Sequence, residues 1–282
     1  MTQDFLHTTL GRTGIPIHRV GLSASYRPGT RVIRRAIDEG INLFFCFGID
    51  NQMISVIREI PPAEREKFVL VTGAYNLLWG HPNLRRTLEK RLRQLRTDYV
   101  DVFLFLGVTK PGQMSDAVFE ELGRFKEEKK VRAFGLSTHD RKFAGALSRQ
   151  GMVDALMIRY NAAHRGAERD IFPLLQPHNP GVISYTSTRW TYLIRRPKGW
   201  PKEKPVPTAP MTYRFVLSNP NVHACLMAPA NEKHFDENLA GIRQGPLSEH
   251  EMTFMQEFGD VVYRTAKSFF SFADRRELRH RN

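Results

Sequence analysis

Short apolar segments alternate with amphipathic segments along most of the chain. Eight apolar runs occur, at residues 19–23, 43–47, 68–72, 100–106, 131–136, 155–158, 181–185 and 224–227. Runs of this kind are typical of strands that are buried on both faces. Helical spacing of apolar residues predicts helices between them, at residues 30–39, 53–60, 83–95, 116–128, 141–149 and 171–175. This alternation indicates a parallel α/β fold that closes into one (β/α)8 TIM barrel.

Two further elements are expected outside the repeating pattern. The glycine spacing at residues 10–15 predicts a hairpin turn before the first barrel strand. Apolar residues between Met252 and Val262 predict an amphipathic helix after the last strand. We expect one barrel domain over residues 1–282, with a core at about residues 6–263 and a basic tail at residues 271–282.

Residues 195–207, between the seventh and eighth predicted strands, are rich in Pro and Lys. With Trp190 and Trp200 nearby, this loop is either a lid over the barrel mouth or a stiff surface loop. In a parallel barrel the mouth lies where the strands end, because the connecting loops converge there. Candidate functional residues are therefore expected directly after the apolar runs.

The composition narrows the class of protein. Hydrophobic residues make up 41% and charged residues 25%, which is ordinary for a globular protein with a sizeable core. No apolar run approaches the roughly 20 residues that would span a bilayer, and no secretory signal is visible. Cys46 and Cys225 lie in separate apolar runs, which favours reduced structural thiols in a cytoplasmic protein.

The formal net charge of +13 favours anionic or phosphorylated ligands. Most basic residues lie on the polar faces of predicted helices, which favours a solvated surface. No nucleic-acid recognition motif accompanies the charge, and no His or Asp residues have metal-ligand spacing. We expect a small-molecule substrate, no specific nucleic acid, no membrane and no metal, while a protein partner stays open.

Six short motifs, in order along the chain, resemble those of the aldo-keto reductase superfamily. They are LGRTG at residues 10–14, AIDEGIN at 36–42, TDYVDV at 97–102, KVRAFGLS at 130–137, RYN at 159–161 and DENL at 236–239. The resemblance implies a (β/α)8 barrel that binds NADPH or NADH across the C-terminal ends of its strands. It also implies reversible hydride transfer to a carbonyl.

The superfamily's reaction uses an Asp, a Tyr, a Lys and a His at the barrel mouth. The phenol donates a proton to the carbonyl oxygen, and the Lys paired with the Asp lowers the pKa of the phenol. The resemblance places these four positions at Phe45, Asp50, Gly73 and Leu106. General acid catalysis is worth about 10²–10⁴-fold, so we expect efficient carbonyl reduction by the family's mechanism to be absent.

Three residues are candidates for proton transfer in place of the missing phenol. Tyr75 either reaches the mouth or is a packed aromatic residue. Asp50 is either a desolvated base or the N-cap of the next helix. His139 follows the fifth strand beside Asp140 and belongs to the residue type that titrates near neutral pH.

A polar cluster follows the sixth strand and allows two interpretations. It consists of Arg159, Tyr160, Asn161, His164 and Arg165. These residues either receive an anionic substrate or form a structural loop anchored by Asn161.

The resemblance also implies residues for a dinucleotide site. Ser137 and Thr138 occupy positions that bind the carboxamide, and Tyr185 occupies the position of the ring that stacks on nicotinamide. Met157 replaces the Gln that is the third carboxamide partner. The positions that hold adenine are Glu237 and Asn238, and the phosphate positions are residues 228–231, ending at Asn231, with Lys233 or Arg243 as substitute cations.

Two functions therefore stay open. The first is an atypical oxidoreductase that binds a nicotinamide dinucleotide and uses a non-standard proton donor. The second is a catalytically inactive pseudoenzyme that binds a ligand or a partner. The polar groups at the nicotinamide end favour the first, whereas Phe45 and Leu106, which make the mouth apolar, favour the second.

Overall fold

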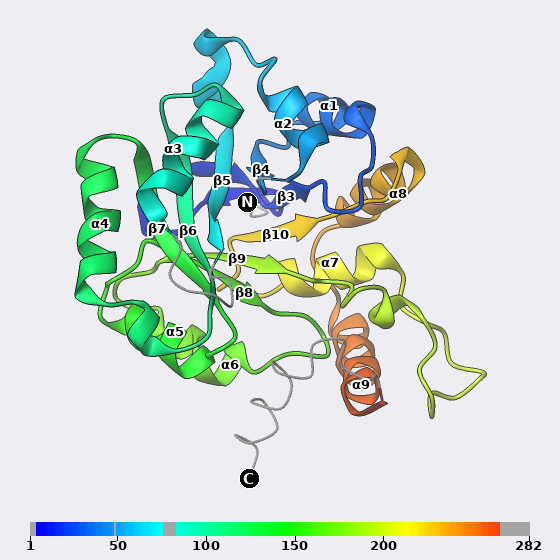
Figure 1. The fold of residues 1–282 in the computed structure, drawn as a ribbon. Helices are drawn as coiled ribbons and strands as arrows, with labels where there is room; N and C mark the ends of the chain where they lie inside the picture. The colour runs from blue at the N-terminus through cyan, green and yellow to red at the C-terminus, as the bar shows by residue number, and fades with distance from the viewer. Residues whose placement is uncertain (1–3, 48, 76–82, 266–282) are drawn as a thin grey trace.

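Eight parallel strands close into a barrel at the centre of the molecule (Figure 1). The computed structural model describes residues 4–47, 49–75 and 83–265, so the predicted tail at 271–282 lies outside it. The barrel strands are β3 Val20–Ser23, β4 Leu43–Phe45, β5 Val69–Tyr75, β6 Val100–Val108, β7 Val131–Thr138, β8 Ala155–Arg159, β9 Gly181–Tyr185 and β10 Ala224–Met227. They are hydrogen-bonded in chain order, and β10 closes the barrel against β3. The predicted (β/α)8 fold is confirmed.

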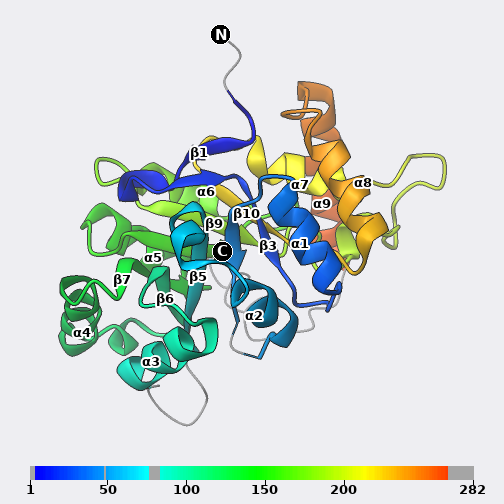
Figure 2. The same cartoon turned by 90° about the horizontal axis from the view of Figure 1, so that it is seen from above.

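A two-stranded antiparallel hairpin precedes the barrel (Figure 2). It is formed by β1 His7–Thr9 and β2 Pro16–His18, which are joined through the short 3-10 turn η1 Gly11–Thr13. Gly14 ends this turn at a φ of 70°, a left-handed conformation that glycine adopts without strain. Three hairpin side chains, those of Leu10, Ile15 and Ile17, pack into the barrel interior. The hairpin therefore closes the end of the barrel opposite the mouth, and the prediction of a turn here is confirmed.

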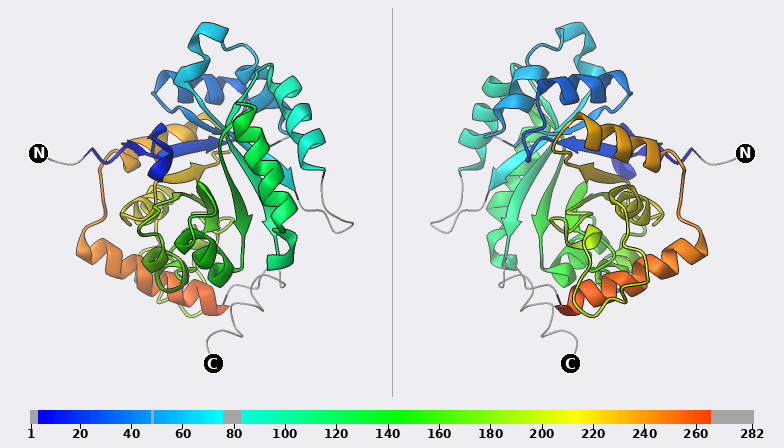
Figure 3. Two further views of the ribbon diagram at one scale, coloured as in Figure 1. Left: turned by 90° about the vertical axis from the view of Figure 1, so that its left-hand side faces the viewer. Right: turned by 90° about the vertical axis from the view of Figure 1, so that its right-hand side faces the viewer.

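Helices surround the barrel on all sides. They are α1 Thr30–Asp38, α2 Asn51–Ile57, α3 Leu84–Leu95, α4 Asp116–Glu127, α5 Arg141–Arg149, α6 Ala167–Asp170, α7 Ala209–Leu217, α8 Glu232–Ile242 and α9 Glu249–Thr265. Short 3-10 turns add η2 Pro62–Lys67, η3 Pro111–Gln113, η4 Phe172–Leu174 and η5 Tyr192–Ile194. Figure 3 shows α4 facing the viewer in one panel and α8 in the other, so these helices lie on opposite sides of the barrel.

Two predicted helical features differ from the structure. The expected helix at residues 171–175 is the 3-10 turn η4, and the α-helical turn α6 lies just before it. The pattern does not predict α7, because all six residues from Thr212 to Leu217 are buried. A helix that is buried all round has no polar face, and so it lacks the periodicity by which helices are predicted.

The strands separate an inner core from an outer core. On β6, the side chains of Val102 and Leu104 belong to the inner core inside the barrel, whereas Phe103 and Phe105 belong to the outer core beneath the helices. Because both faces of each strand are buried, the strands are continuous apolar runs in the sequence. Both cysteines are buried free thiols, as expected.

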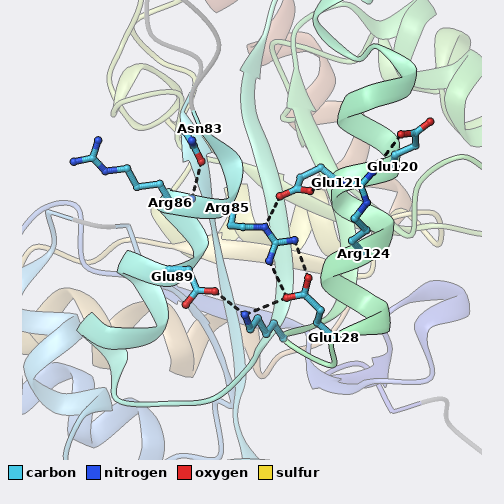
Figure 4. Close-up of polar contacts among 9 residues, drawn as sticks. Asn83, Arg85, Arg86, Glu89, Glu120, Glu121, Arg124 and Glu128 are labelled. Carbon is cyan, nitrogen blue, oxygen red and sulfur yellow. Dashed lines mark hydrogen bonds and ion pairs between the residues drawn. The ribbon is translucent and has the colours of Figure 1, made fainter.

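An ion-pair network joins the polar faces of α3 and α4 (Figure 4). Arg85 donates to Glu121 at 2.8 Å and to both carboxylate oxygens of Glu128 at 2.8 Å. Lys130 bridges Glu128 at 3.1 Å and Glu89 at 2.6 Å. The hydrogen bonds from Arg85 lower the pKa of Glu128 to about 2. This part of the basic excess is a solvated structural surface, as predicted.

Residues 195–207 form a surface loop packed against α9. Trp200 is buried, with its ring centroid 4.9 Å from that of Phe258 and 6.0 Å from that of Phe254. Its Nε1 donates to the Pro205 carbonyl at 2.9 Å. Figure 1 shows the loop projecting beyond α9, so the structure supports the surface-loop interpretation over the lid. No helix in the described part of the chain is long and apolar enough to cross a membrane.

The buried His18 and the partly buried His223 make the stability of the barrel sensitive to acid. The Nδ1 atoms of His18 and His223 accept the backbone N–H groups of Val20 and Val182, each at 3.0 Å. Burial lowers the pKa of both imidazoles to about 4. A histidine in the unfolded chain has a pKa of about 6.5, so the unfolded state binds more protons between about pH 4 and pH 6.5. The free energy of unfolding therefore has its full value above this window and falls as the pH decreases through it.

We expect the free energy of unfolding to decrease by up to ~1 kcal/mol per pH unit for each histidine within the window. Urea unfolding between about pH 4.5 and pH 7.5, which covers most of that window and the plateau above it, measures the slope. His223→Asn should flatten it, because the amide oxygen accepts the same N–H without titrating. His250→Asn, at an exposed position of α9, is the matched control. An equal slope in the wild type and in His223→Asn would contradict the assignment.

Candidate active site

Aromatic and apolar side chains line one side of the barrel mouth. Phe45, at the end of β4, stacks on Phe47 with ring centroids 6.2 Å apart and planes inclined by 17°. Phe47 packs edge-on against Tyr75, at the end of β5, again with centroids 6.2 Å apart. Leu106 of β6 is only 4% exposed. The mouth beside β4, β5 and β6 therefore offers apolar surface to a ligand.

The backbones of β5 and β6 approach closely at the position that the resemblance gives to the lysine. A Cβ atom on Gly73 would lie 2.1 Å from the carbonyl oxygen of Leu104 and 3.0 Å from Cγ of Leu106. Atoms this close overlap, so a lysine at position 73 would need a shift of the β6 backbone. The packing of these two strands therefore favours glycine at position 73.

Asp50 is the N-cap of α2. Its Oδ1 accepts the backbone N–H of Met53 at 3.1 Å, which satisfies one of the free donors of the helix end. Burial of the carboxyl group raises the pKa of Asp50. The N-cap interpretation is confirmed, and a role of Asp50 as a base stays a prediction.

His139 and Tyr185 meet at the other side of the mouth. Tyr185 Oη lies 3.4 Å from His139 Nε2, and the two rings are in a T-shaped arrangement with centroids 6.2 Å apart. His139 is exposed and stands in a tight turn, because Thr138 Oγ1 accepts the Asp140 N–H at 2.9 Å and Asp140 caps α5. The structure brings these two candidates together, whereas Tyr75 packs against Phe47.

The polar cluster after β8 is a structural loop anchored by Asn161. Asn161 Oδ1 accepts the N–H groups of Ala163 at 3.1 Å and His164 at 3.0 Å, and its amide donates to the Thr186 carbonyl at 2.8 Å. Arg165 pairs with Asp260 of α9 at 2.9 Å. These contacts support the structural interpretation over an anion site. In the described part of the chain, no His, Cys, Asp and Glu side chains cluster as metal ligands.

A cavity of about 680 Å³ lies beside the mouth, between α7, α8 and the segments that follow β9 and β10. Tyr26, Met211 and Tyr213 form part of its apolar wall. Glu237 and Asn238 contribute polar groups from α8, and Asn238 is only 5% exposed. A cavity of this size and polarity suits a small molecule or a cofactor fragment.

The predicted cofactor residues at α8 differ in their placement. Glu237 and Asn238 line the cavity, as the resemblance implies. Asn231 is the N-cap of α8, and its Oδ1 accepts the His234 N–H at 2.9 Å. Lys233 is an exposed residue whose Nζ lies 3.8 Å from Glu237, and Arg243 pairs with Glu39 at 2.7 Å.

Sequence reasoning missed most of the lining residues, among them Tyr26, Thr188 and Tyr213. Tyr26 and Thr188 lie on loops, and Tyr213 lies on the unpredicted helix α7. No local pattern identifies such residues, because distant segments of the chain bring them together.

Comparisons with known proteins agree with this geometry. The model of the Aldo/keto reductase family matches residues 29–196. The chain is similar to the uncharacterized oxidoreductase YqkF of Bacillus subtilis (strain 168), with 23% identity over 292 residues, 88% of this chain and 94% of the relative. Among solved structures, the holo form of aldo-keto reductase AKR11C1 from Bacillus halodurans aligns with a TM-score of 0.72. That alignment has 18% identity and covers 95% of this chain and 99% of the other.

An aldo-keto reductase structure from Pseudomonas aeruginosa aligns with a TM-score of 0.67. It is 22% identical, and the alignment covers 85% of this chain and 94% of the other. At this level of identity the two structures bear on the fold alone. The family model matches more than half of the chain. The chain therefore belongs to the aldo/keto reductase family, whose members bind NAD(P)H and act on small carbonyl compounds.

Proposed function

We propose that the protein is a nicotinamide-dinucleotide-dependent oxidoreductase that reduces a small carbonyl compound. The observation that carries this proposal is the contact between Tyr185 and His139 at the barrel mouth. It supplies a phenol beside a titratable group, which is the chemistry that the family obtains from other positions.

The described residues fit the two ends of the cofactor. The cavity beside α8 is large enough for an adenosine, and the buried Asn238 and the carboxylate of Glu237 lie on its wall. We assign the carboxamide to Ser137 and Thr138, which are buried at the end of β7. A bound cofactor would supply the hydride at this end of the site.

In this proposal Tyr185 donates a proton to the carbonyl oxygen of the substrate. The phenolate left on Tyr185 Oη lies within reach of His139 Nε2, which returns a proton to it. Because His139 is exposed, it recovers its own proton from water. The distance of 3.4 Å is long for a hydrogen bond, and such contacts often shorten only when the substrate binds.

The apolar side of the mouth indicates the substrate class. Phe45, Phe47 and Leu106 offer no hydrogen-bonding group to a substrate. An aromatic or branched aliphatic aldehyde or ketone would bury its apolar part here at about 25 cal/mol per Å². We therefore propose an apolar carbonyl compound over a sugar or a polar acid.

Binding and turnover test the proposal separately. Titration of the purified protein with NADH and with NADPH, followed by tryptophan quenching, should give saturable binding of at least one cofactor. Consumption of the bound reduced cofactor is then followed with a panel of aromatic, aliphatic and sugar aldehydes. Faster turnover with the apolar members is the expected result, and failure of both cofactors to bind would exclude the proposal.

The second candidate function is a pseudoenzyme that binds a ligand or a partner. The close approach of β5 and β6 at Gly73, together with the apolar Phe45 and Leu106, favours it. Saturable cofactor binding without turnover across the whole panel would identify this function.

A further inference from the structure

The charges around the cavity beside α8 bear on the cofactor that it selects. Among its lining residues, Arg214, His234 and Glu237 have ionisable side chains that project from α7 and α8. Arg214 is only 6% exposed, and its guanidinium is directed to the first turn of α9 and to the segment before it. It donates to Glu251 at 2.9 and 3.1 Å, to the Gly245 carbonyl at 2.8 Å and to the Pro246 carbonyl at 2.9 Å. Its charge is thus balanced by Glu251.

Cations near the outer face of α8 are also held in ion pairs. Arg31 contacts Glu232 at 3.1 Å, and Arg35 contacts Asp236 at 2.8 Å. Lys233 lies 3.8 Å from Glu237 and is 80% exposed. None of the three cations is among the residues that line the cavity.

The N-terminus of α8 is already capped and carries a negative charge. Asn231 accepts the His234 N–H, and Glu232 places a carboxylate in the first turn. A capped helix end that already carries a negative charge attracts a phosphate less than a free one does.

We infer that the site takes NADH in preference to NADPH, on the basis of the proposed function that places the adenosine ribose in this cavity. The two cofactors differ only in the 2′-phosphate, which adds a charge of about −1.5 to −2 near pH 7. That charge would lie near Glu237, whereas the guanidinium of Arg214 on the same wall is already paired with Glu251. The 2′-hydroxyl of NADH can instead donate a hydrogen bond to a carboxylate, as it does in other dinucleotide sites.

Calorimetric titration of the wild-type protein with each cofactor tests this preference without any substrate. We expect NADH to bind at least about tenfold more tightly than NADPH, the scale of one unbalanced charge-assisted contact. Equal or tighter binding of NADPH would overturn the inference and leave the proposed function standing. Failure of both cofactors to bind would remove the proposed function and the inference together.

A variant with an added cation tests the cause of the preference. Ala230 lines the cavity, is exposed and directly precedes Asn231, so Ala230→Arg brings a guanidinium to the cavity wall without filling a buried space. NADPH should bind about tenfold more tightly to this variant, and NADH should change little. Ala117→Arg, at an exposed position of α4 on the opposite side of the barrel, is the matched control (Figure 3). An unchanged ratio of affinities in Ala230→Arg, with an unchanged melting temperature, would overturn the inference.

Discussion

Asp101→Ala is expected to lower the free energy of unfolding by about 3–5 kcal/mol, because it removes one partner of a buried ion-pair group. Asp101 is fully buried on β6, where Oδ2 accepts Arg65 Nη2 at 2.8 Å and the Leu70 N–H at 2.9 Å. Its Oδ1 accepts Arg132 Nη1 at 2.9 Å. Without the carboxylate, Arg65 stays largely buried with an uncompensated charge, and the Leu70 N–H loses its acceptor.

This carboxylate connects four elements of the barrel wall, namely η2, β5, β6 and β7. Its loss should therefore reduce the stability of the whole barrel and not of one edge. Urea denaturation followed by circular dichroism measures the change. The nearby Asp98 is exposed, so Asp98→Ala should change the free energy of unfolding by no more than about 0.5 kcal/mol. A loss below about 1 kcal/mol for Asp101→Ala would show that the ion pairs do not support the fold.

Tyr185→Phe is expected to lower the turnover number by about 10²–10⁴-fold, the usual contribution of a general acid. The aromatic ring remains, so the dissociation constant of the cofactor should change little. Steady-state turnover and the cofactor titration, measured on the same preparation, separate the two effects. Tyr99→Phe is the matched control, because Tyr99 precedes β6 at the end of the barrel opposite the mouth.

Two other variants distinguish the candidate proton donors. His139→Asn should lower turnover less than Tyr185→Phe does, because the phenol that donates the proton remains. It should also change the pH dependence of the rate, because the imidazole that returns a proton to Tyr185 is lost. Tyr75 is 51% exposed and packs on Phe47, so Tyr75→Phe should leave most of the turnover. If Tyr75→Phe abolished turnover and Tyr185→Phe did not, the proton donor would be Tyr75.

Much of the fold could be predicted from the sequence for a physical reason. Strands buried on both faces must be apolar along their whole length, and each of the eight expected runs overlaps a barrel strand. Helix caps also depend on neighbouring residues alone. Asn83, at the start of α3, accepts the backbone N–H of Arg86 at 2.8 Å. Helix α7 escaped prediction because it is buried and has no polar face.

The sequence by itself determined the barrel and the family, and the resemblance singled out Glu237 and Asn238, which line the cavity. The barrel follows from hydrophobic periodicity, which is local to each strand and helix, whereas the family and the two residues follow from short motifs of neighbouring residues. Only the tertiary structure decided that Tyr185 meets His139, that Arg214 is directed to Glu251 and that β6 closes against Gly73. These contacts join residues far apart in the chain, and closure of the barrel sets which of them meet.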